Sequence, residues 1–517
     1  MADYKILWAD DEVDLLKPLV IFLERKGFEV HTVTNGLDAL DKVEKYNYDV
    51  IFLDENMPGL SGLETLSRIK EKKSDVPVVM ITKSEEEHLM EDAIGSKIAD
   101  YLIKPVNPNQ ILLSVKKLLD NKRLISEKTT MNYQQEFRSI AMAFMDKMDF
   151  NEWKTIYKKL VFWELELEKS KESTMYEVFE NQKKEANHNF ADFIKKNYLD
   201  FVQGKNPKAP LMSKDLLRKK VFPHVSDNTP VVFLLIDNLR YDQWKIIRPL
   251  LSDHYDIEEE DIYLSILPTT TQYCRNAIFS GMMPLDIEKK FPKLWSNDED
   301  EGGKNMHEET FLTEHIKYAL RNKKFNYSKI TNLEGGKNLA EQITNLIQSD
   351  LTVIVYNFVD ALSHARTDVS LVRELSDDEA AYRSVTRSWF EHSPLLEALK
   401  KAAEKKIKLI ISTDHGSVKV KDPIKIIGDK NTNTNLRYKQ GKNLNYNSKE
   451  VFEIKNPEAA LLPKLHISSG FVFADQQKFF AYPNNYNYYV NYYKDTIQHG
   501  GISLEEMMIP VITLKSK

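Results

Sequence analysis

The pattern of apolar and polar positions divides the chain into three regions. In the first, residues 1 to about 120, short apolar runs alternate with amphipathic stretches that are each long enough for one helix. This alternation is typical of a parallel sheet covered by helices on both faces. The runs that we take as strands are Lys5–Ala9, Val30–Val33, Val50–Leu53, Val78–Ile81 and Tyr101–Ile103. We therefore expect a (βα)5 domain that binds its ligands at the carboxyl ends of the strands.

The two regions that follow differ in their periodicity. From residue 121 to about 220 the apolar residues recur at intervals of three and four, which predicts packed helices. From residue 221 to 517 an α/β pattern returns, and its most apolar runs, VVFLLID, LTVIVYNFVD and KLIISTDHG, are typical of strands buried on both faces. Each of these runs leads to an aspartate, namely Asp237, Asp360 and Asp414. The chain is thus predicted to be an α/β multidomain protein with an all-α connector at 121–220.

Composition narrows the class of protein. The 517 residues are 42% hydrophobic, which suits several globular cores, and the net charge of −6 argues against a protein that coats nucleic acid. The single cysteine, Cys274, excludes an intramolecular disulfide framework and a multi-cysteine zinc finger, so a metal needs His, Asp or Glu ligands. The chain has no apolar run near the roughly 20 residues that span a bilayer and no signal-peptide pattern. We expect a cytoplasmic protein without membrane insertion.

Polar residues follow the strands of the first region. They are Asp10, Asp11, Asp54, Thr82 and Lys104. Because the carboxyl ends of parallel strands meet at one edge of a sheet, these side chains are expected to converge there. An acidic cluster of this kind suits Mg²⁺, and an aspartate such as Asp54 can form an aspartyl phosphate that Thr82 and Lys104 would contact.

The motifs ADDE, LDENMPGLSG, ITK and DYLIKP resemble those of the receiver domain of two-component response regulators, over residues 1–120. The resemblance implies phosphorylation of Asp54 by a sensor histidine kinase and formation of a homodimer on phosphorylation. It also implies Mg²⁺ ligands and phosphate-sensing residues. The ligands are Asp10, Asp11 and Asp54, and the sensing pair is Thr82 and Lys104. Lys83 departs from the family pattern, in which a small residue is usual.

A second set of polar residues lies in the third region. Asp360 and His364 are four residues apart, a spacing that puts both side chains on one face of a helix. Asp and His suit zinc or manganese, and six candidates suffice for two metals that clamp the attacking and leaving oxygens. The candidates are Asp237, Asp360, His364, Asp414, His415 and His499. Thr271 lies in a threonine-rich turn and could act as a nucleophile once a metal lowers its pKa.

These motifs resemble the PglZ branch of the alkaline phosphatase superfamily, over residues 225 to 517. The nucleophile motif maps onto Pro268, Thr269, Thr271, Gly281 and Pro284. The resemblance implies two zinc ions. One would be bound by Asp360, His364 and His499, and the other by Asp237, Asp414, His415 and Thr271. A receiver fused to a PglZ domain (1–120 and 221–517, joined by 121–220) resembles PorX-type response regulators, which are associated with type IX secretion.

The sequence gives fewer signals for the substrate than for the metal ligands. Threonine-nucleophile members of the superfamily are often phosphodiesterases, so the resemblance favours a hydrolase acting on nucleotide or oligonucleotide phosphodiesters through a phosphothreonine intermediate. Residues 418–444 carry seven Lys or Arg against two Asp, which suits either a polyanion-binding loop or an ordinary solvated surface. Candidate contacts with the substrate are Arg275, Lys425 and Arg437.

An alternative function is that of a signalling adaptor, whose PglZ domain binds a sigma factor or a secretion component without catalysis. A pure adaptor has no physical need for six metal ligands and a nucleophile, which favours the enzyme. A DNA-binding regulator is disfavoured because the sequence has no evident recognition helix.

Overall fold

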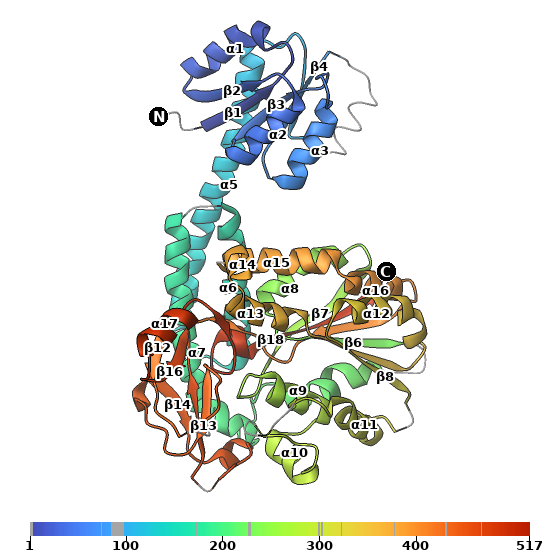
Figure 1. Cartoon of the computed structure of the whole chain (residues 1–517), viewed down its shortest axis with the longest axis vertical. Helices are drawn as coiled ribbons and strands as arrows, with labels where there is room; N and C mark the ends of the chain where they lie inside the picture. Colours follow the sequence, from blue (N-terminus) through green and yellow to red (C-terminus); the bar gives the residue numbers. More distant parts are fainter. Residues whose placement is uncertain are drawn as a thin grey trace. The chain divides into compact units, whose positions relative to one another are not determined.

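The computed structural model separates into two compact units, Met1–Asn132 and Tyr133–Lys517, which we describe one at a time (Figure 1). The residues that the structure describes are 4–73, 75–83, 98–170, 173–225, 229–297, 300, 303–321, 323–376, 378–429, 432–466 and 468–517. Within this part of the chain, no helix has the combination of length and apolar composition that crossing a membrane requires.

The first unit contains a five-stranded parallel sheet with strand order β2-β1-β3-β4-β5. Its elements are β1 (Tyr4–Ala9), α1 (Val13–Arg25), β2 (Phe28–Val33), α2 (Gly36–Lys45), β3 (Val50–Asp54), α3 (Gly62–Lys72), β4 (Val78–Thr82) and β5 (Asp100–Ile103). Alternate residues of β1 enter two different cores, with Leu7 on one face of the sheet and Trp8 on the other. The five predicted strands and the (βα)5 class are confirmed. The segment 84–97, which precedes β5, lies outside the described residues.

The connector consists of three long helices. They are α5 (Pro108–Ala143), α6 (Phe150–Ser170) and α7 (Ser173–Val202). Trp153 of α6 packs against Phe190 of α7, and both rings belong to the same hydrophobic core as the strand residue Phe233. The predicted helical connector is therefore present, but α6 and α7 form one compact unit with the C-terminal α/β region.

The second unit is built on a six-stranded sheet with strand order β7-β18-β10-β6-β9-β8. Its strands are β6 (Val231–Ile236), β7 (Tyr255–Leu264), β8 (Phe325–Ile330), β9 (Leu351–Tyr356), β10 (Lys408–Ser412) and β18 (Met508–Ser516). The strands β10, β6, β9 and β8 are parallel, whereas β18 is antiparallel to both of its neighbours. Every residue of β6 is buried, as its unbroken apolar run predicts.

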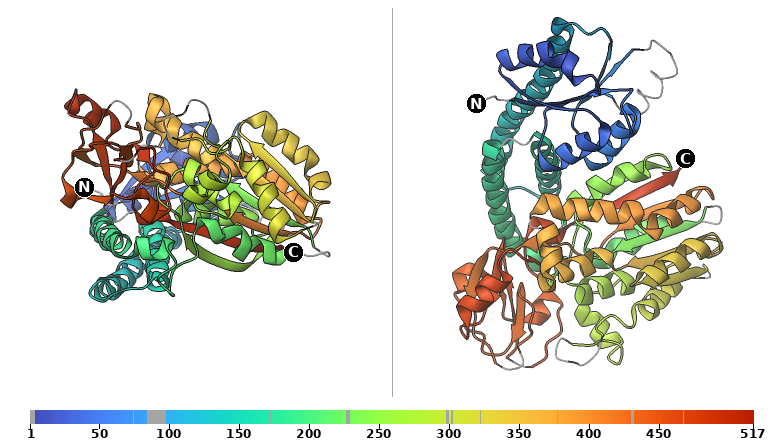
Figure 2. Two further views of the ribbon diagram at one scale, coloured as in Figure 1. Left: turned by 90° about the horizontal axis from the view of Figure 1, so that it is seen from below. Right: turned by 45° about the horizontal axis from the view of Figure 1, so that its top comes forward.

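Helices cover both faces of this sheet (Figures 1 and 2). One face carries α8 (Tyr241–Ile247), α12 (Leu333–Leu346), α15 (Glu379–His392) and α16 (Pro394–Ala403). The other carries α9 (Thr271–Ser280), α10 (Pro284–Lys290) and α11 (Glu308–Ala319). The helices α13 (Phe358–Asp368) and α14 (Ser370–Leu375) follow β9. Short 3-10 or π turns lie at Ser213–Asp215, Leu217–Val221, Phe222–His224, Arg248–Leu251, Ser448–Glu450 and Pro457–Ala460.

A smaller lobe is inserted between β10 and β18, shown in orange and red in Figure 1. Its elements are β11 (Val418–Lys419), β12 (Asp422–Lys425), β13 (Tyr438–Gly441), β14 (Val451–Ile454), β15 (Gly470–Ala474), β16 (Lys478–Ala481), α17 (Tyr486–Tyr493) and β17 (Ile497–Gln498), before α18 (Leu504–Met507). Because β10, β6 and β9 are adjacent and parallel, the loops that follow them meet at one edge of the sheet.

Candidate functional site

The sheet edge of the first unit brings two of its predicted aspartates, Asp10 and Asp54, together around Lys104. The Nζ of Lys104 lies 2.8 Å from Oδ2 of Asp10 and 3.0 Å from Oδ1 of Asp54, and both aspartates are buried. Burial, with the charges of Asp10 and Asp11 nearby, raises the pKa of Asp54, while Lys104 opposes that rise. Lys104 thus offsets the charge of a buried acidic pair.

The carboxylates next to β1 form a cluster that could hold a cation. Oxygen atoms of Asp10, Asp11 and Glu12 lie within 4.8 Å of one another. Glu12 was not among the predicted ligands, although the motif ADDE contains it, and its carboxylate pairs with Lys83 at 3.1 Å. The hydroxyl of Thr82 donates to Glu55 at 2.5 Å.

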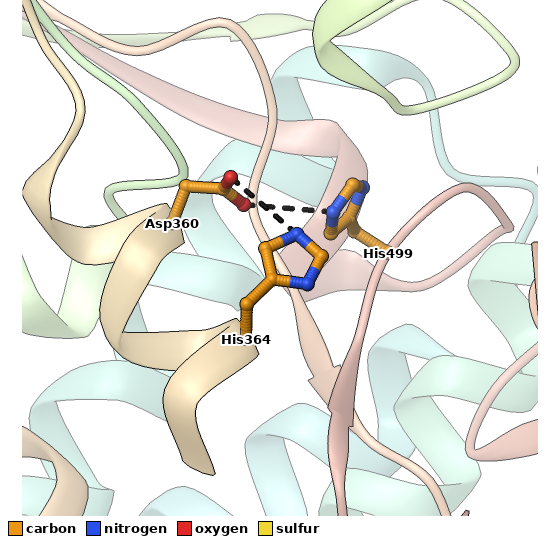
Figure 3. Close-up of side chains that lie close together, drawn as sticks. All are labelled: Asp360, His364 and His499. Atoms are coloured by element: carbon orange, nitrogen blue, oxygen red, sulfur yellow. Dashed lines mark ion pairs between the residues drawn. The ribbon is translucent and has the colours of Figure 1, made fainter. Parts of the chain in front are cut away.

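In the second unit, Asp360, His364 and His499 form one triad (Figure 3). The two carboxylate oxygens of Asp360 each face a histidine, with His364 Nε2 at 3.5 Å from Oδ2 and His499 Nε2 at 3.5 Å from Oδ1. Asp360 does not end a strand as expected, because β9 stops at Tyr356. It lies in the first turn of α13, four residues before His364 on the same helix. The His364 side chain is 65% exposed, so this triad opens to solvent.

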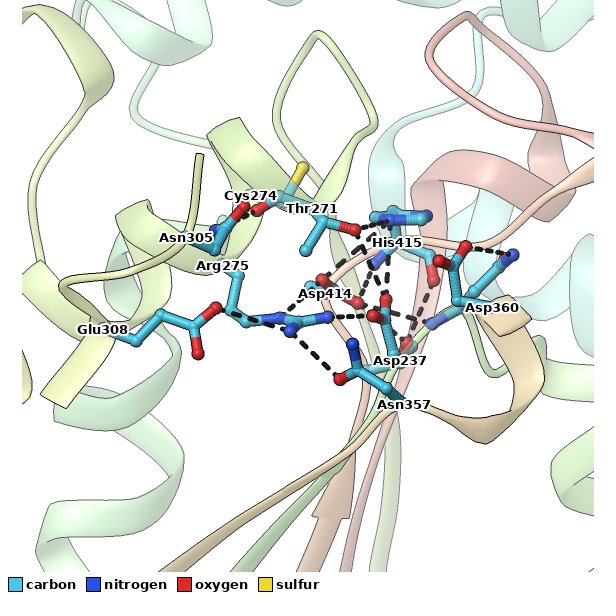
Figure 4. A network of polar contacts seen from close by, with 12 residues as sticks. Asp237, Thr271, Cys274, Arg275, Asn305, Glu308, Asn357, Asp360, Asp414 and His415 are labelled. Atoms are coloured by element: carbon cyan, nitrogen blue, oxygen red, sulfur yellow. Dashed lines mark hydrogen bonds and ion pairs between the residues drawn. The ribbon is translucent and has the colours of Figure 1, made fainter. Parts of the chain in front are cut away.

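Asp237, Asp414 and His415 form a second triad, which is almost fully buried (Figure 4). His415 Nε2 lies 3.8 Å from Oδ1 of Asp237 and 3.9 Å from Oδ2 of Asp414. The hydroxyl oxygen of Thr271 lies 3.1 Å from His415 Nε2 and 3.5 Å from Asp237 Oδ1. Thr271 is the first residue of α9, so its hydroxyl stands at the positive end of the helix dipole.

Arg275, one turn further along α9, is held by three carboxylates. Its guanidinium pairs with Asp237, with Asp414 at 3.0 Å and with Glu308 at 3.4 Å, and the side chain is fully buried. Burial alone would raise the pKa of Asp414, but Arg275 and neighbouring donors outweigh it and lower the pKa to about 2. For Asp237 burial is the largest influence, and it raises the pKa well above the usual range. Arg275 therefore orients both carboxylates and is not open to solvent.

Asn238 joins the two triads. Its backbone N–H donates to Asp414 Oδ1 at 3.4 Å, and its side-chain amide donates to Asp360 Oδ1 at 3.4 Å. The residue is buried and has a φ of 63°, a left-handed conformation that asparagine tolerates better than most residues. The rings of His415 and His499 also stack, with centroids 4.3 Å apart. Sequence reasoning missed Asn238, although its place directly after Asp237 was a usable signal.

The two triads suit metal ions. Their N···O separations of 3.5–3.9 Å are long for hydrogen bonds, whereas two ligands about 2.0–2.1 Å from one tetrahedral zinc stand roughly 3.3 Å apart. Burial, followed by the neighbouring His415, lowers the pKa of His499 to about 3, so its imidazole is neutral at pH 7. A neutral imidazole offers the lone pair that a metal needs. The residues present therefore fit the expected ions.

Two of the predicted substrate contacts are not presented to a ligand. Arg437 is fully buried and pairs with Glu506, with Nη2 to Oε2 at 2.6 Å, which corrects the expectation that it binds substrate. Arg275 is likewise enclosed by carboxylates. Lys425 is exposed on β12, and its ammonium lies 4.8 Å from the centre of the Tyr486 ring.

The structure also bears on the basic stretch at 418–444, for which a polyanion-binding loop and an ordinary solvated surface were both open. Lys439 is buried as well as Arg437, and other cations of the stretch have acidic neighbours, such as Asp495 at 4.0 Å from Lys419 and Glu180 at 4.0 Å from Lys421. Lys430 lies outside the described residues. The local excess of positive charge is therefore reduced by burial and pairing.

Comparison with known families follows the same division of the chain. The model for the response regulator receiver domain matches residues 6–116, and that for the PorX response regulator linker domain matches residues 123–202. The model for the BREX system PglZ alkaline phosphatase-like domain matches residues 216–514, which is more than half of the chain.

Individual relatives match over about a fifth of the chain. The transcriptional regulatory protein ResD of Bacillus subtilis is 38% identical over 115 residues, which are 22% of this chain and 48% of ResD. The transcriptional regulatory protein SrrA of Staphylococcus aureus is 35% identical over 115 residues, 22% of this chain and 47% of SrrA. The chain thus spans about half the length of these curated relatives.

Solved structures match over a similar share of the chain. A two-component response regulator from Clostridium difficile is 31% identical, with a TM-score of 0.22, over 23% of this chain and 97% of that one. Response regulator protein TrrA from Thermotoga maritima is 36% identical, with a TM-score of 0.21, over 22% and 98%.

The family matches agree with the structure, in which a five-stranded α/β domain is followed by connector helices and a larger α/β region. The receiver domain implies a cognate sensor kinase as a partner, and the receiver and phosphatase-like families both use metal ions. The chain belongs to the PglZ alkaline phosphatase-like family and carries this domain in a PorX-type fusion with a response regulator receiver.

Proposed function

We propose that the PglZ domain is a zinc-dependent phosphodiesterase in which Thr271 is the nucleophile and phosphorylation of Asp54 controls activity. The observation that supports this most directly is the position of the Thr271 hydroxyl, 3.1 Å from His415 Nε2 and 3.5 Å from Asp237 Oδ1. A hydroxyl at this place, at a helix N-terminus beside two carboxylate–histidine triads, suits attack on phosphorus.

Two zinc ions would be held in the two triads. One set is Asp360, His364 and His499, and the other is Asp237, Asp414, His415 and Thr271. When bound, zinc supplies Lewis acidity that lowers the pKa of a hydroxyl and offsets the negative charge of a phosphoryl group. In the receiver, Asp10, Asp11 and Asp54 would hold Mg²⁺, with Glu12 as an additional carboxylate.

In the first step the oxygen of Thr271 attacks phosphorus, the bond to the leaving alkoxide breaks, and a phosphothreonine ester forms. The hydroxyl proton passes from Thr271 to solvent, and the leaving alkoxide takes up a proton from solvent. In the second step water attacks the same phosphorus and the bond between phosphorus and the Thr271 oxygen breaks. That oxygen takes up a proton from the attacking water, which restores the hydroxyl as the phosphate monoester leaves. Asn305 donates to the carbonyl oxygen of Thr271 at 3.0 Å and so fixes the turn that presents it, while Arg275 holds Asp237 and Asp414 in place.

The substrate class and the signalling context rest on resemblance. Nucleotide or oligonucleotide phosphodiesters are the substrates proposed, because threonine-nucleophile members of the superfamily are often phosphodiesterases. A sensor histidine kinase would phosphorylate Asp54, with Thr82 and Lys104 contacting the phosphoryl group, and a homodimer would form. The output proposed is regulation of type IX secretion by a cytoplasmic protein, and its support is the resemblance to PorX-type response regulators. The exposed Lys425 is the remaining candidate for a substrate contact.

The test is hydrolysis of bis(p-nitrophenyl) phosphate and p-nitrophenyl phosphate by the full-length protein, with zinc and after chelation. Thr271→Val keeps the size of the side chain but removes its hydroxyl, and we expect kcat/KM to fall by on the order of 10³-fold or more. Thr271→Ser keeps the hydroxyl and should retain most of the activity. Asp54→Asn should abolish the response to a phosphoryl donor but leave basal hydrolysis in place.

The outcomes distinguish the enzyme from the adaptor. Full activity in Thr271→Val would exclude the covalent mechanism. Protein that binds zinc at both triads yet hydrolyses neither ester, nor any of a panel of dinucleotides, would favour the adaptor that binds a sigma factor or secretion component.

A further inference from the structure

The short helix α18 contacts the loops that carry one histidine of each triad. The Glu506 carboxylate accepts the N–H of Gly501 at 2.9 Å, two residues after His499. The backbone carbonyl of Glu506 accepts the N–H of Gly416 at 3.2 Å, next to His415. The position of α18 therefore affects the positions of both His499 and His415.

The backbone of α18 lies very close to the loop that carries Asp414 and His415. A Cβ atom at Gly416 would lie 2.0 Å from the carbonyl oxygen of Glu505 and 3.4 Å from Cγ of Arg240. Only glycine allows the two backbones to come this close. A displacement of α18 would thus be passed directly to the loop of Asp414 and His415.

The connector helix α7 holds α18 through Asn187, which is buried. Its side-chain oxygen accepts the N–H of Leu504 at 2.8 Å, and its amide nitrogen donates to Glu505 Oε2 at 3.2 Å. Lys183, one turn earlier, lies 3.3 Å from Glu505 Oε1. Because both ends of the Asn187 amide are used, the contact fixes the direction as well as the distance of α18.

Ion pairs that begin at Lys183 connect α7 to the loop that follows Asp237. Lys183 pairs with Glu164 of α6 at 3.0 Å, and Arg383 joins Glu164 at 2.8 Å to Asp242 at 3.0 Å. Asp242 in turn pairs with Arg240 at 2.6 Å, three residues after Asp237. Buried charge networks of this kind tolerate few alternative arrangements, because an unpaired member is costly.

We propose that Asn187 is a positioning residue for the candidate metal site. Through α18 it sets where His415 and His499 lie relative to each other, so the connector helix α7 is part of the PglZ catalytic unit. The consequence for catalysis rests on the proposed function. The effect of Asn187 on α18, and on the loops that carry His415 and His499, does not.

The experiment compares Asn187→Leu with Asn189→Leu in the full-length protein. Asn189 lies on the same helix, and the hydrogen bond that its amide donates among the described residues runs to the backbone carbonyl of Glu185, at 3.1 Å within that helix. Hydrogen exchange is measured in the metal-free protein over residues 499–507 and 414–416. The visible spectrum of the Co²⁺-loaded protein reports the geometry of the ligands, and urea unfolding confirms that each variant is folded.

We expect Asn187→Leu to speed exchange in 499–507 and 414–416 at least tenfold and to change the Co²⁺ spectrum, with Asn189→Leu matching the wild type. If Asn187→Leu does not fold, Asn187→Asp serves instead. It keeps the acceptor for Leu504 but repels Glu505, and it should show the same changes to a smaller degree. A folded variant with wild-type exchange and spectrum overturns the proposal. Hydrogen exchange is measured without metal or substrate. The exchange result therefore tests the role of Asn187 even if the protein proves not to be a phosphodiesterase.

Discussion

The carbonyl oxygen of Thr269 lies 3.3 Å from Nδ1 of His499. This contact assigns the ring proton to Nδ1 and leaves Nε2 free to face Asp360, as expected for an imidazole that binds a metal through Nε2. The Thr269 hydroxyl also accepts the N–H of Gly500 at 3.0 Å and donates to the carbonyl of Gly501 at 2.9 Å. The segment that precedes the proposed nucleophile thus fixes a ligand of the other triad.

Replacing Thr269 should therefore disturb the site without touching the nucleophile. Thr269→Val removes the hydroxyl, leaves the N–H of Gly500 buried and unpaired, and should cost about 1–3 kcal/mol of stability. We expect kcat/KM for bis(p-nitrophenyl) phosphate to fall at least tenfold. The matched control is Thr270→Val, since the buried hydroxyl of Thr270 has no hydrogen-bond partner among the described residues. Equal activity of the two variants would show that Thr269 does not position His499.

Gly281, the glycine of the nucleophile motif, occupies a position where its backbone conformation and the nearby ring of His315 favour glycine over other residues. It ends α9 with a φ of 66°, and a Cβ atom there would lie 2.5 Å from the buried ring of His315. Gly281→Ala should lower the free energy of unfolding by about 2–4 kcal/mol, combining backbone strain with the clash. Adding His315→Ala should remove the clash but not the strain, so the loss in the double variant should be less than the sum of the two single losses in urea unfolding. Additive losses would contradict this explanation.

The periodicity of the sequence was sufficient for the buried parallel strands but not for the surfaces against which the connector helices pack. Buried parallel strands such as β6 are nearly all apolar, so their positions are evident from the sequence. Whether helices such as α6 and α7 form a separate body depends on which long-range surface their apolar faces meet. Trp153 and Phe190 meet the core of the α/β region, and helical periodicity carries no information on that partner.

The site was predictable where a side chain's chemistry and its place after a strand agreed. Asp237, Asp414 and His415 follow strands, and the structure brings them together. Asn238 was missed because its role depends on a left-handed backbone and on contacts to residues far along the chain. Arg437 was misjudged because positive charge in a sequence does not distinguish an exposed cation from one buried against a carboxylate.

The Arg437–Glu506 pair should behave as a structural unit. Both side chains are fully buried, and Nε of Arg437 adds a second contact, at 3.1 Å, to Oε1 of Glu506. Arg437→Met leaves a buried carboxylate without its cation and should cost about 3–5 kcal/mol. Combining it with Glu506→Gln should cost less than the sum of the single changes, as measured by urea unfolding in a double-mutant cycle. A coupling energy near zero would mean that the pair is not mutually dependent.

Lys439 gives the protein a distinctive dependence on pH. The side chain is 1% exposed, its ammonium donates to the carbonyl of Asn433 at 2.9 Å and lies 4.8 Å from the centre of the Tyr482 ring, and no described carboxylate forms an ion pair with it. Burial lowers its pKa from 10.5 to about 7. Between these two values the unfolded chain binds a proton that the folded chain does not. Stability contributed by this residue must therefore rise with pH from about 7 to 10.5, and it is lowest below pH 7.

Lys439→Met should remove that dependence, because it fills the same space without a charge. At pH 6 the wild type buries an ammonium group and the variant does not, so the variant should be more stable there by roughly 1–4 kcal/mol. Each pKa unit of the shift corresponds to about 1.4 kcal/mol, so the difference should shrink as the pH approaches 10. Urea unfolding of both proteins at pH 6, 8 and 9.5 measures it, with Lys442→Met, at a partly exposed lysine of the same segment, as the control. A stability difference that stays constant across this range would mean that Lys439 remains protonated in the folded protein.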